Sequence, residues 1–120
     1  MPKIHIKPGV RFDLIAPAGA RILEILKYVV AHLDHDITIT SGTDGKHSGP
    51  KDPHKTGEAY DLRTRGLTPL QISRMLKDIK TKLGPRFFAF HEAVGTSHAH
   101  IHVQRKRGTT YSMEDYLGNA

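Results

Sequence analysis

Apolar residues recur every three or four positions in two stretches of the chain, which is the spacing of an amphipathic helix. The first stretch predicts a helix over residues 19–33, with charged residues between the apolar ones. The second predicts a helix over residues 68–83, because Pro69 suits a first helical position and Gly84 with the proline after it ends the pattern. The apolar positions are Ile22, Leu23, Leu26, Val29, Val30 and Leu33, then Leu70, Ile72, Met75, Leu76, Ile79 and Leu83.

Shorter stretches alternate apolar and polar residues and predict strands. They cover residues 36–41, 58–64, 87–93 and 99–104, and residues 10–15 are a further candidate. The short connection between the last two main stretches predicts an antiparallel hairpin. The elements lack the regular strand–helix–strand alternation of a parallel sheet, so we expect an α+β fold with a mainly antiparallel sheet and helices packed on one face.

The length of 120 residues suits one domain that buries a core without disulfides. We therefore predict a single domain over residues 1–120, with its core at about residues 10–105 and a C-terminal tail over residues 106–120. The N-terminal stretch has no apolar segment of signal-peptide length, and no segment approaches the roughly 20 apolar residues of a membrane span. These features predict cytoplasmic synthesis and no membrane span.

The charge balance favours an anionic partner. Lys and Arg number 18 against 12 Asp and Glu, which gives a formal net charge of +6. Such a charge suits nucleic acid or an acidic cell-wall polymer. The basic run at residues 105–107 has no interleaved aromatic residues on which bases would stack, so nucleic acid is the less favoured of the two.

The nine histidines indicate a metal site, because the chain has no cysteine and imidazole and carboxylate are then its strong metal ligands. His54 lies in a Gly-, Pro- and Lys-rich loop, and Asp61 follows seven positions later in a predicted strand. Alternation places His98, His100 and His102 on one face of another strand. Two imidazoles and one carboxylate form a typical catalytic zinc set, whose open position holds a water of pKa about 7 that would act as the nucleophile.

Two of these segments carry a family resemblance. The pattern His-x-x-Gly-x-Ala-x-Asp, from His54 to Asp61, followed by His-x-His, from His100 to His102, resembles the superfamily of D-alanyl-D-alanine carboxypeptidases and hedgehog domains. The resemblance covers roughly residues 37–104. It implies that His54, Asp61 and His102 bind Zn²⁺, and that His100 lies beside the metal to hydrogen-bond substrate or stabilise the oxyanion.

Glu92 is the expected general base, because related proteins carry an acidic residue near the metal before the hairpin turn. His91 and Glu92 point to opposite faces of a regular strand, so only one of them faces the site, and we favour Glu92. His5, His47 and His98 are assigned no role and are interpreted as solvated side chains.

The sequence departs from the carboxypeptidase pattern before the long loop. Many members have Ser-Gly-Tyr-Arg there, and the arginine binds the substrate carboxylate, whereas here Ser41-Gly42 continues as Thr43-Asp44. Carboxypeptidase and endopeptidase activity therefore both stay open. Other cations that would replace the arginine are Lys46, Lys51, Lys55 and Arg63.

Two further departures concern the residues around the ligands. Gln104 stands where several family members have Asp, and Asp52 stands two positions before His54, where a small hydroxyl residue is common. Either change would alter the side chains that orient a metal ligand.

The leading hypothesis is a zinc metallopeptidase that hydrolyses peptidoglycan stem peptides, as in cell wall degradation by a phage or bacterial lytic enzyme. Its action at the cell wall would then require release by another route, such as a holin. The alternative is a zinc-stabilised binding module of the same fold with little or no catalysis. A third hypothesis, a basic nucleic-acid-binding protein with incidental histidines, predicts no stoichiometric metal and an affinity that falls steeply with salt.

Overall fold

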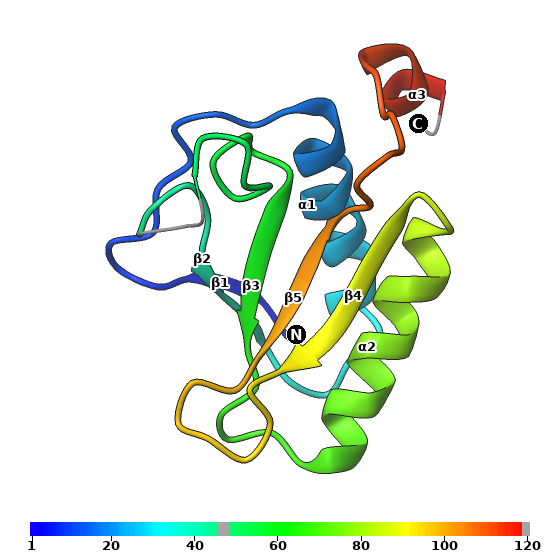
Figure 1. Cartoon of the computed structure of the whole chain (residues 1–120). Coiled ribbons are helices and arrows are strands. Elements are labelled where there is room, and N and C mark those ends of the chain that lie inside the picture. Colours follow the sequence, from blue (N-terminus) through cyan, green and yellow to red (C-terminus); the bar gives the residue numbers. More distant parts are fainter. Residues whose placement is uncertain (46–48, 119–120) are drawn as a thin grey trace.

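The computed structural model describes residues 1–45 and 49–118. One five-stranded sheet has the strand order β1-β2-β3-β5-β4; β1 is parallel to β2, and the other neighbouring strands are antiparallel. The predicted α+β fold with a mainly antiparallel sheet is confirmed (Figure 1). The strands are β1 (Ile4–Ile6), β2 (Ile37–Ser41), β3 (Ala59–Arg63), β4 (Phe87–Glu92) and β5 (His100–Arg105), and the helices are α1 (Pro17–Val30), α2 (Pro69–Leu83) and α3 (Met113–Gly118).

The two long helices cover the same face of the sheet, as the sequence predicted (Figure 1). Helix α1 begins with a proline in its first turn and buries its apolar stripe, including Ile22 and Leu26, which are fully covered. Helix α2 begins at a capping box in which Thr68 and Gln71 bond each other's backbone N–H groups. Its buried residues Met75 and Ile79 complete the core.

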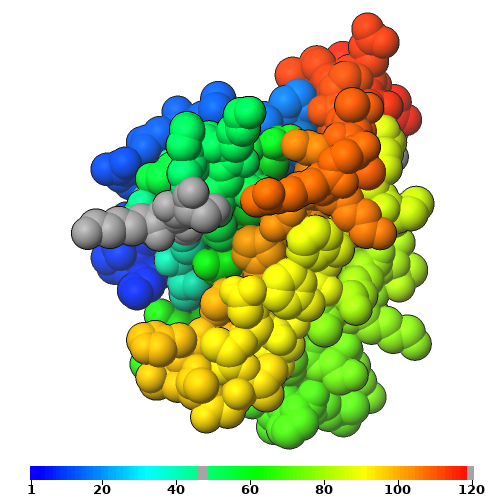
Figure 2. Space-filling model, viewed as in Figure 1, coloured from blue at the N-terminus to red at the C-terminus, as the bar shows by residue number. Residues whose placement is uncertain are grey.

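Strand alternation divides the sheet into an inner, apolar face and an outer, polar face. Each strand except β1 sends fully or almost fully buried side chains toward the helices. The outer face carries Asp61 on β3 directly opposite His102 on β5, and Glu92 on β4 opposite His100. Figure 2 shows this outer face, with the β4–β5 connection at its lower edge. The inner residues are Ile37, Ile39, Tyr60, Leu62, Phe87, Ala89, Ile101 and Val103.

The prediction of a strand over residues 10–15 is wrong. This segment is irregular, and its Arg11 carbonyl accepts hydrogen bonds from the backbone N–H and hydroxyl of Thr43. The additional strand is β1, which pairs in parallel with β2. Strand β1 has three residues, which are too few to show a period. A turn at Pro8-Gly9 separates it from residues 10–15, whose alternation had predicted the strand.

The chain after residue 106 also contains structure that the sequence analysis did not assign. Helix α3 contacts α1, and Tyr111 is 9% exposed with its ring 5.1 Å from that of Phe87. No helix within the described residues has the length and apolar character needed to cross a membrane.

Candidate metal centre

His54, Asp61 and His102 meet on the outer face of the sheet. The Asp61 Oδ1 atom lies 3.3 Å from His54 Nε2 and 3.0 Å from His102 Nδ1. One ligand atom from each residue lies within 4.8 Å of the other two. The three residues that the sequence resemblance singled out therefore form one group that could hold a metal ion.

Between His54 and Asp61, the local structure requires a glycine at position 57 and a small residue at position 59. Gly57 adopts a φ of +75°, and a Cβ atom there would lie 2.2 Å from the Leu14 carbonyl oxygen. Ala59 is fully buried where β3 begins. A glycine and a small residue thus let the loop turn into β3 close beneath the chain that precedes α1, which brings His54 back over Asp61.

Both imidazoles are oriented by a hydrogen bond from the nitrogen that faces away from Asp61. His54 Nδ1 donates to the Gly42 carbonyl at 3.0 Å, and His102 Nε2 donates to Gln104 Oε1 at 2.7 Å. The opposite nitrogens, His54 Nε2 and His102 Nδ1, face Asp61 and would offer their lone pairs to a bound metal ion in place of a proton. Such bonds fix the tautomer and ring orientation of metal-binding histidines.

Gln104 and Asp52, the two residues near the ligands that differ from the family pattern, have distinct roles. Gln104 hydrogen-bonds His102, so an amide oxygen does what a carboxylate would do at that position. Asp52 instead accepts a hydrogen bond of 2.9 Å from the backbone N–H of His54 and so fixes the loop backbone.

The surroundings of Asp61 favour the ionised form of its carboxyl group. Burial alone would raise the pKa of Asp61, but hydrogen bonds from His102 and His54 outweigh it and hold the pKa well below its usual range. Burial lowers the pKa of His102, whereas the hydrogen bonds to Asp61 and Gln104 raise it, and the net direction is upward. The donor set of two imidazole nitrogens and one carboxylate oxygen fits a divalent metal ion, whose charge would take over the role of these protons.

Glu92 and His100 lie at the rim of the group. His100 Nε2 is 2.9 Å from Glu92 Oε1 and 3.7 Å from Asp61 Oδ1. Glu92, His100 and His102 form a second cluster that could hold a metal ion, but it shares His102 with the first. The neighbouring His91 points to the other side of β4, with its Nε2 atom 3.3 Å from Thr64 Oγ1. Glu92 therefore faces the site and His91 does not, as expected.

The other histidines differ in their positions. His98 lies in the turn before β5 and is exposed, so it is not part of the strand in which the alternation placed it. Its carbonyl accepts a hydrogen bond of 2.7 Å from His100 Nδ1. His5 pairs with Asp36 at 2.7 Å on an exposed surface, and His47 lies outside the described residues.

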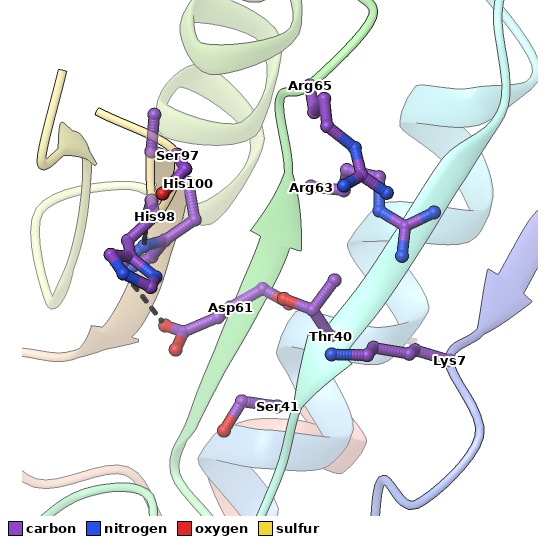
Figure 3. Close-up of a pocket in the computed structure, with 10 residues that line it drawn as sticks. Lys7, Thr40, Ser41, Asp61, Arg63, Arg65, Ser97, His98 and His100 are labelled. Atoms are coloured by element: carbon purple, nitrogen blue, oxygen red, sulfur yellow. Dashed lines mark hydrogen bonds and ion pairs between the residues drawn. The ribbon is translucent and has the colours of Figure 1, made fainter. Parts of the chain in front are cut away.

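Of the four cations considered as replacements for the family's arginine, Lys51 and Lys55 do not face the site and Arg63 does. Lys55 Nζ donates to the carbonyls of Thr43 and Gly45 and so holds the loop, and Lys51 is exposed on a turn. Lys46 lies outside the described residues. Arg63 lines a pocket beside Asp61 and His100 (Figure 3).

Sequence reasoning missed an aromatic pair on the other side of the group. The rings of Phe88 and Phe90 are stacked at 5.5 Å, and Phe90 lies 5.4 Å from the His102 ring. Phe90 is 37% exposed. The period of two that links Phe88, Phe90 and Glu92 along β4 was the available signal, because it places all three on the face of the histidines.

In comparisons with known proteins, no family model, no curated protein and no solved structure matches this chain.

Proposed function

We propose that the protein is a zinc-dependent peptidase that hydrolyses peptide bonds in peptidoglycan stem peptides. The observation that carries the proposal is the arrangement of Asp61 between His54 and His102, with Glu92 and His100 hydrogen-bonded to each other at the rim. Three protein ligands with an acid–base residue beside them are typical of a catalytic rather than a structural zinc site. The sequence pattern from His54 to His102 supports the same chemistry.

His54, Asp61 and His102 would hold the zinc. When bound, zinc lowers the pKa of a coordinated water to about 7 and polarises a substrate carbonyl. Glu92 accepts the proton of the attacking water as its oxygen bonds to the carbonyl carbon, and delivers that proton to the amine when the C–N bond breaks. His100 donates its Nε2–H to the carbonyl oxygen as negative charge develops there.

The charge and the surface support a wall peptide as substrate. The net charge of +6 attracts the protein to an anionic polymer. The group of His54, Asp61 and His102, called the metal group below, lies on the outer face of the sheet next to an open pocket. An extended peptide can therefore reach it without a change in the core.

The test is digestion of purified peptidoglycan with zinc-loaded protein, followed by mass spectrometry of the released peptides. We expect wild type to release new amino groups and Glu92→Gln to be slower by about 10²–10⁴-fold. Glu114→Gln is the control, because Glu114 is an exposed carboxylate on α3. No release by wild type, or equal rates in wild type and Glu92→Gln, would contradict the proposal.

One observation favours a second candidate, a zinc-stabilised binding module. Asp44, which stands where the carboxypeptidases have their arginine, accepts hydrogen bonds from the backbone N–H groups of Gly42 and Arg11. This position therefore serves the loop and provides no cation for a substrate. The module predicts zinc binding and wall binding without cleavage in the same digestion.

A further inference from the structure

The core between the sheet and the helices is open at the edge formed by β1. Helix α2 packs on β4 at the opposite edge, and α1 contacts β5 and β3 more than β1 (Figure 1). An apolar pocket of about 460 Å³ lies at this opening. Every described residue that lines it is apolar, including Ile4 and Ile6 on β1, Phe12 and Ile15 before α1, and Leu23 on α1. Ile6 is 55% exposed and Ile15 is 46% exposed, so part of the apolar wall lies in contact with solvent.

The backbone of β1 also has a free edge. The N–H of Lys7 and the carbonyl of Lys3 each form a hydrogen bond of 3.0 Å with the backbone of β2. Since successive residues of a strand direct their backbone groups to opposite sides, Ile4 and Ile6 direct theirs away from β2. In the described part of the chain, no backbone group pairs with them on that side. This edge is therefore a template on which another strand can pair.

The exposed lysines around this edge have no acidic partner. Lys3 and Lys7 flank β1, and Lys27 lies on α1, one turn after a leucine that lines the apolar pocket. Among the described residues, none of these three lysines forms an ion pair. Two carboxylates of the neighbouring segments already pair with other basic side chains, Asp36 with His5 at 2.7 Å and Asp13 with Arg11 at 2.9 Å. The edge is therefore suited to a partner that brings negative charge.

Three kinds of occupant would cover the apolar pocket, and the strand edge distinguishes them. A lipid acyl chain would leave the backbone groups of Ile4 and Ile6 without hydrogen bonds, which is costly in hydrocarbon. A second copy of the chain would pair β1 with β1. The antiparallel register that joins the free groups of both copies would place Lys3 of one copy opposite Lys7 of the other, and like charges directly opposite each other are destabilising. An acidic strand of another protein has neither disadvantage.

We propose that β1 binds an extended acidic segment of a partner protein as a sixth strand of the sheet. The backbone of this segment pairs with the free groups of Ile4 and Ile6, and its alternate apolar side chains enter the apolar pocket. The residues between them lie on the outer face of the sheet, where those opposite Lys3 and Lys7 are acidic. The expected pattern is acidic, apolar, any residue, apolar, acidic, which is the same for parallel and antiparallel pairing.

This docking surface is separate from the metal group. The apolar pocket lies on the inner side of the sheet, between β1 and α1, whereas Asp61 and His102 lie on the outer face of β3 and β5. A segment bound at β1 would therefore attach the protein to a partner and leave the metal group accessible. The proposal does not depend on the peptidase activity, and its test measures binding alone.

The test is fluorescence anisotropy of the labelled peptide Ser-Glu-Ile-Thr-Ile-Glu-Ser titrated with the whole protein. We expect this acidic peptide to bind, and a version with lysines in place of the glutamates to bind at least about tenfold more weakly. Ile6→Ser should lower the affinity for the acidic peptide about tenfold, and Lys3→Glu about fivefold. The matched controls are Leu117→Ser on α3 and Lys77→Glu on α2, both at exposed positions, and they should leave the affinity unchanged.

Two N-methylated forms of the acidic peptide test the backbone pairing. Methyl groups on both isoleucine nitrogens block one side of the bound strand, and methyl groups on the nitrogens of the threonine and the second glutamate block the other side. We expect the form that is blocked on the side facing β1 to bind at least about tenfold more weakly, and the other form to retain its affinity.

No binding of the acidic peptide, equal affinity for its lysine version, or full affinity of both N-methylated forms would overturn the proposal. A wild-type dimer in analytical ultracentrifugation that Ile6→Ser dissociates would overturn it in favour of a second copy. Binding to phosphatidylglycerol vesicles that Ile6→Ser abolishes, without binding of the peptide, would overturn it in favour of a membrane. Thermal unfolding at the wild-type temperature shows that Ile6→Ser and Lys3→Glu retain the fold.

Discussion

The ring orientation of His102 depends on one amide. Gln104 Oε1 accepts the Nε2–H at 2.7 Å, and the Gln104 amide group is itself held by the Arg105 carbonyl at 3.0 Å. We predict that Gln104→Ala weakens metal binding by about 10–100-fold, because the imidazole then samples other orientations and tautomers. Competition with a fluorescent zinc chelator measures this affinity.

The control for this change is Gln71→Ala, which removes an amide from the start of α2. It is expected to lower the free energy of unfolding slightly and to leave the zinc affinity unchanged. Equal zinc affinity in Gln104→Ala and wild type would show that His102 needs no such partner.

Gly57 has a steric role that can be separated from metal binding. In Gly57→Ala the new methyl group would meet the Leu14 carbonyl at 2.2 Å in a backbone with φ +75°. We predict a loss of about 3 kcal/mol in the free energy of unfolding, from the strained backbone and the overlap together. Urea denaturation of the metal-free protein measures it.

Gly66 provides the matched comparison, because it has a similar φ of +86° but open space where the methyl group would lie. Gly66→Ala should cost only about 1 kcal/mol, the contribution of backbone strain alone. Similar losses in the two variants would mean that the close approach to Leu14 is relieved without cost.

An ion pair joins Glu58, directly before β3, to Arg105 at the end of β5. Arg105 binds both carboxylate oxygens of Glu58, with Nη2 to Oε1 at 3.1 Å. Burial alone would raise the pKa of Glu58. The hydrogen bonds from Arg105 and Thr56 together have the larger, opposite effect, so the pKa lies below the ordinary value of 4.5.

We predict that Glu58→Gln lowers the free energy of unfolding by roughly 1–3 kcal/mol near pH 7. Since the folded-state pKa is depressed, the contribution of the ionised pair is complete above the unfolded value of 4.5 and is lost as the pH falls through the folded value. Denaturant curves of both proteins from pH 7 to pH 2 test this. A stability difference that stays constant over that range would contradict the prediction.

The elements that the sequence predicted share long, regular patterns. Both long helices and the strands β2 to β5 have clear periods, and alternation placed His100 and His102 on the outer face. The three-residue β1 could not be predicted because it is too short to show a period. The pocket beside Asp61 and His100 could not be predicted either. Two of its lining residues, Lys7 and Arg63, are 56 positions apart and meet only through the parallel pairing of β1 with β2 and the β2–β3 register.

For the whole molecule, the metal group links the loop before β3 to two central strands. A metal ion that binds the folded chain and not the unfolded one stabilises the fold by about 2.7 kcal/mol at a free concentration 100 times its Kd. We predict that zinc at this level raises Tm by about 10 °C and that a chelator reverses the change. Differential scanning calorimetry of wild type and Asp61→Asn, which should show no zinc-dependent rise, tests this.

The most direct test of the metal centre is the metal content of protein purified without added metal and without a histidine tag. Elemental mass spectrometry should find one zinc per chain in wild type and none in His102→Ala, while His5→Ala, a change on an exposed surface, should keep its zinc. Wild type without stoichiometric metal, or equal zinc in wild type and His102→Ala, would contradict the account and return attention to nucleic acid as the partner of this basic chain.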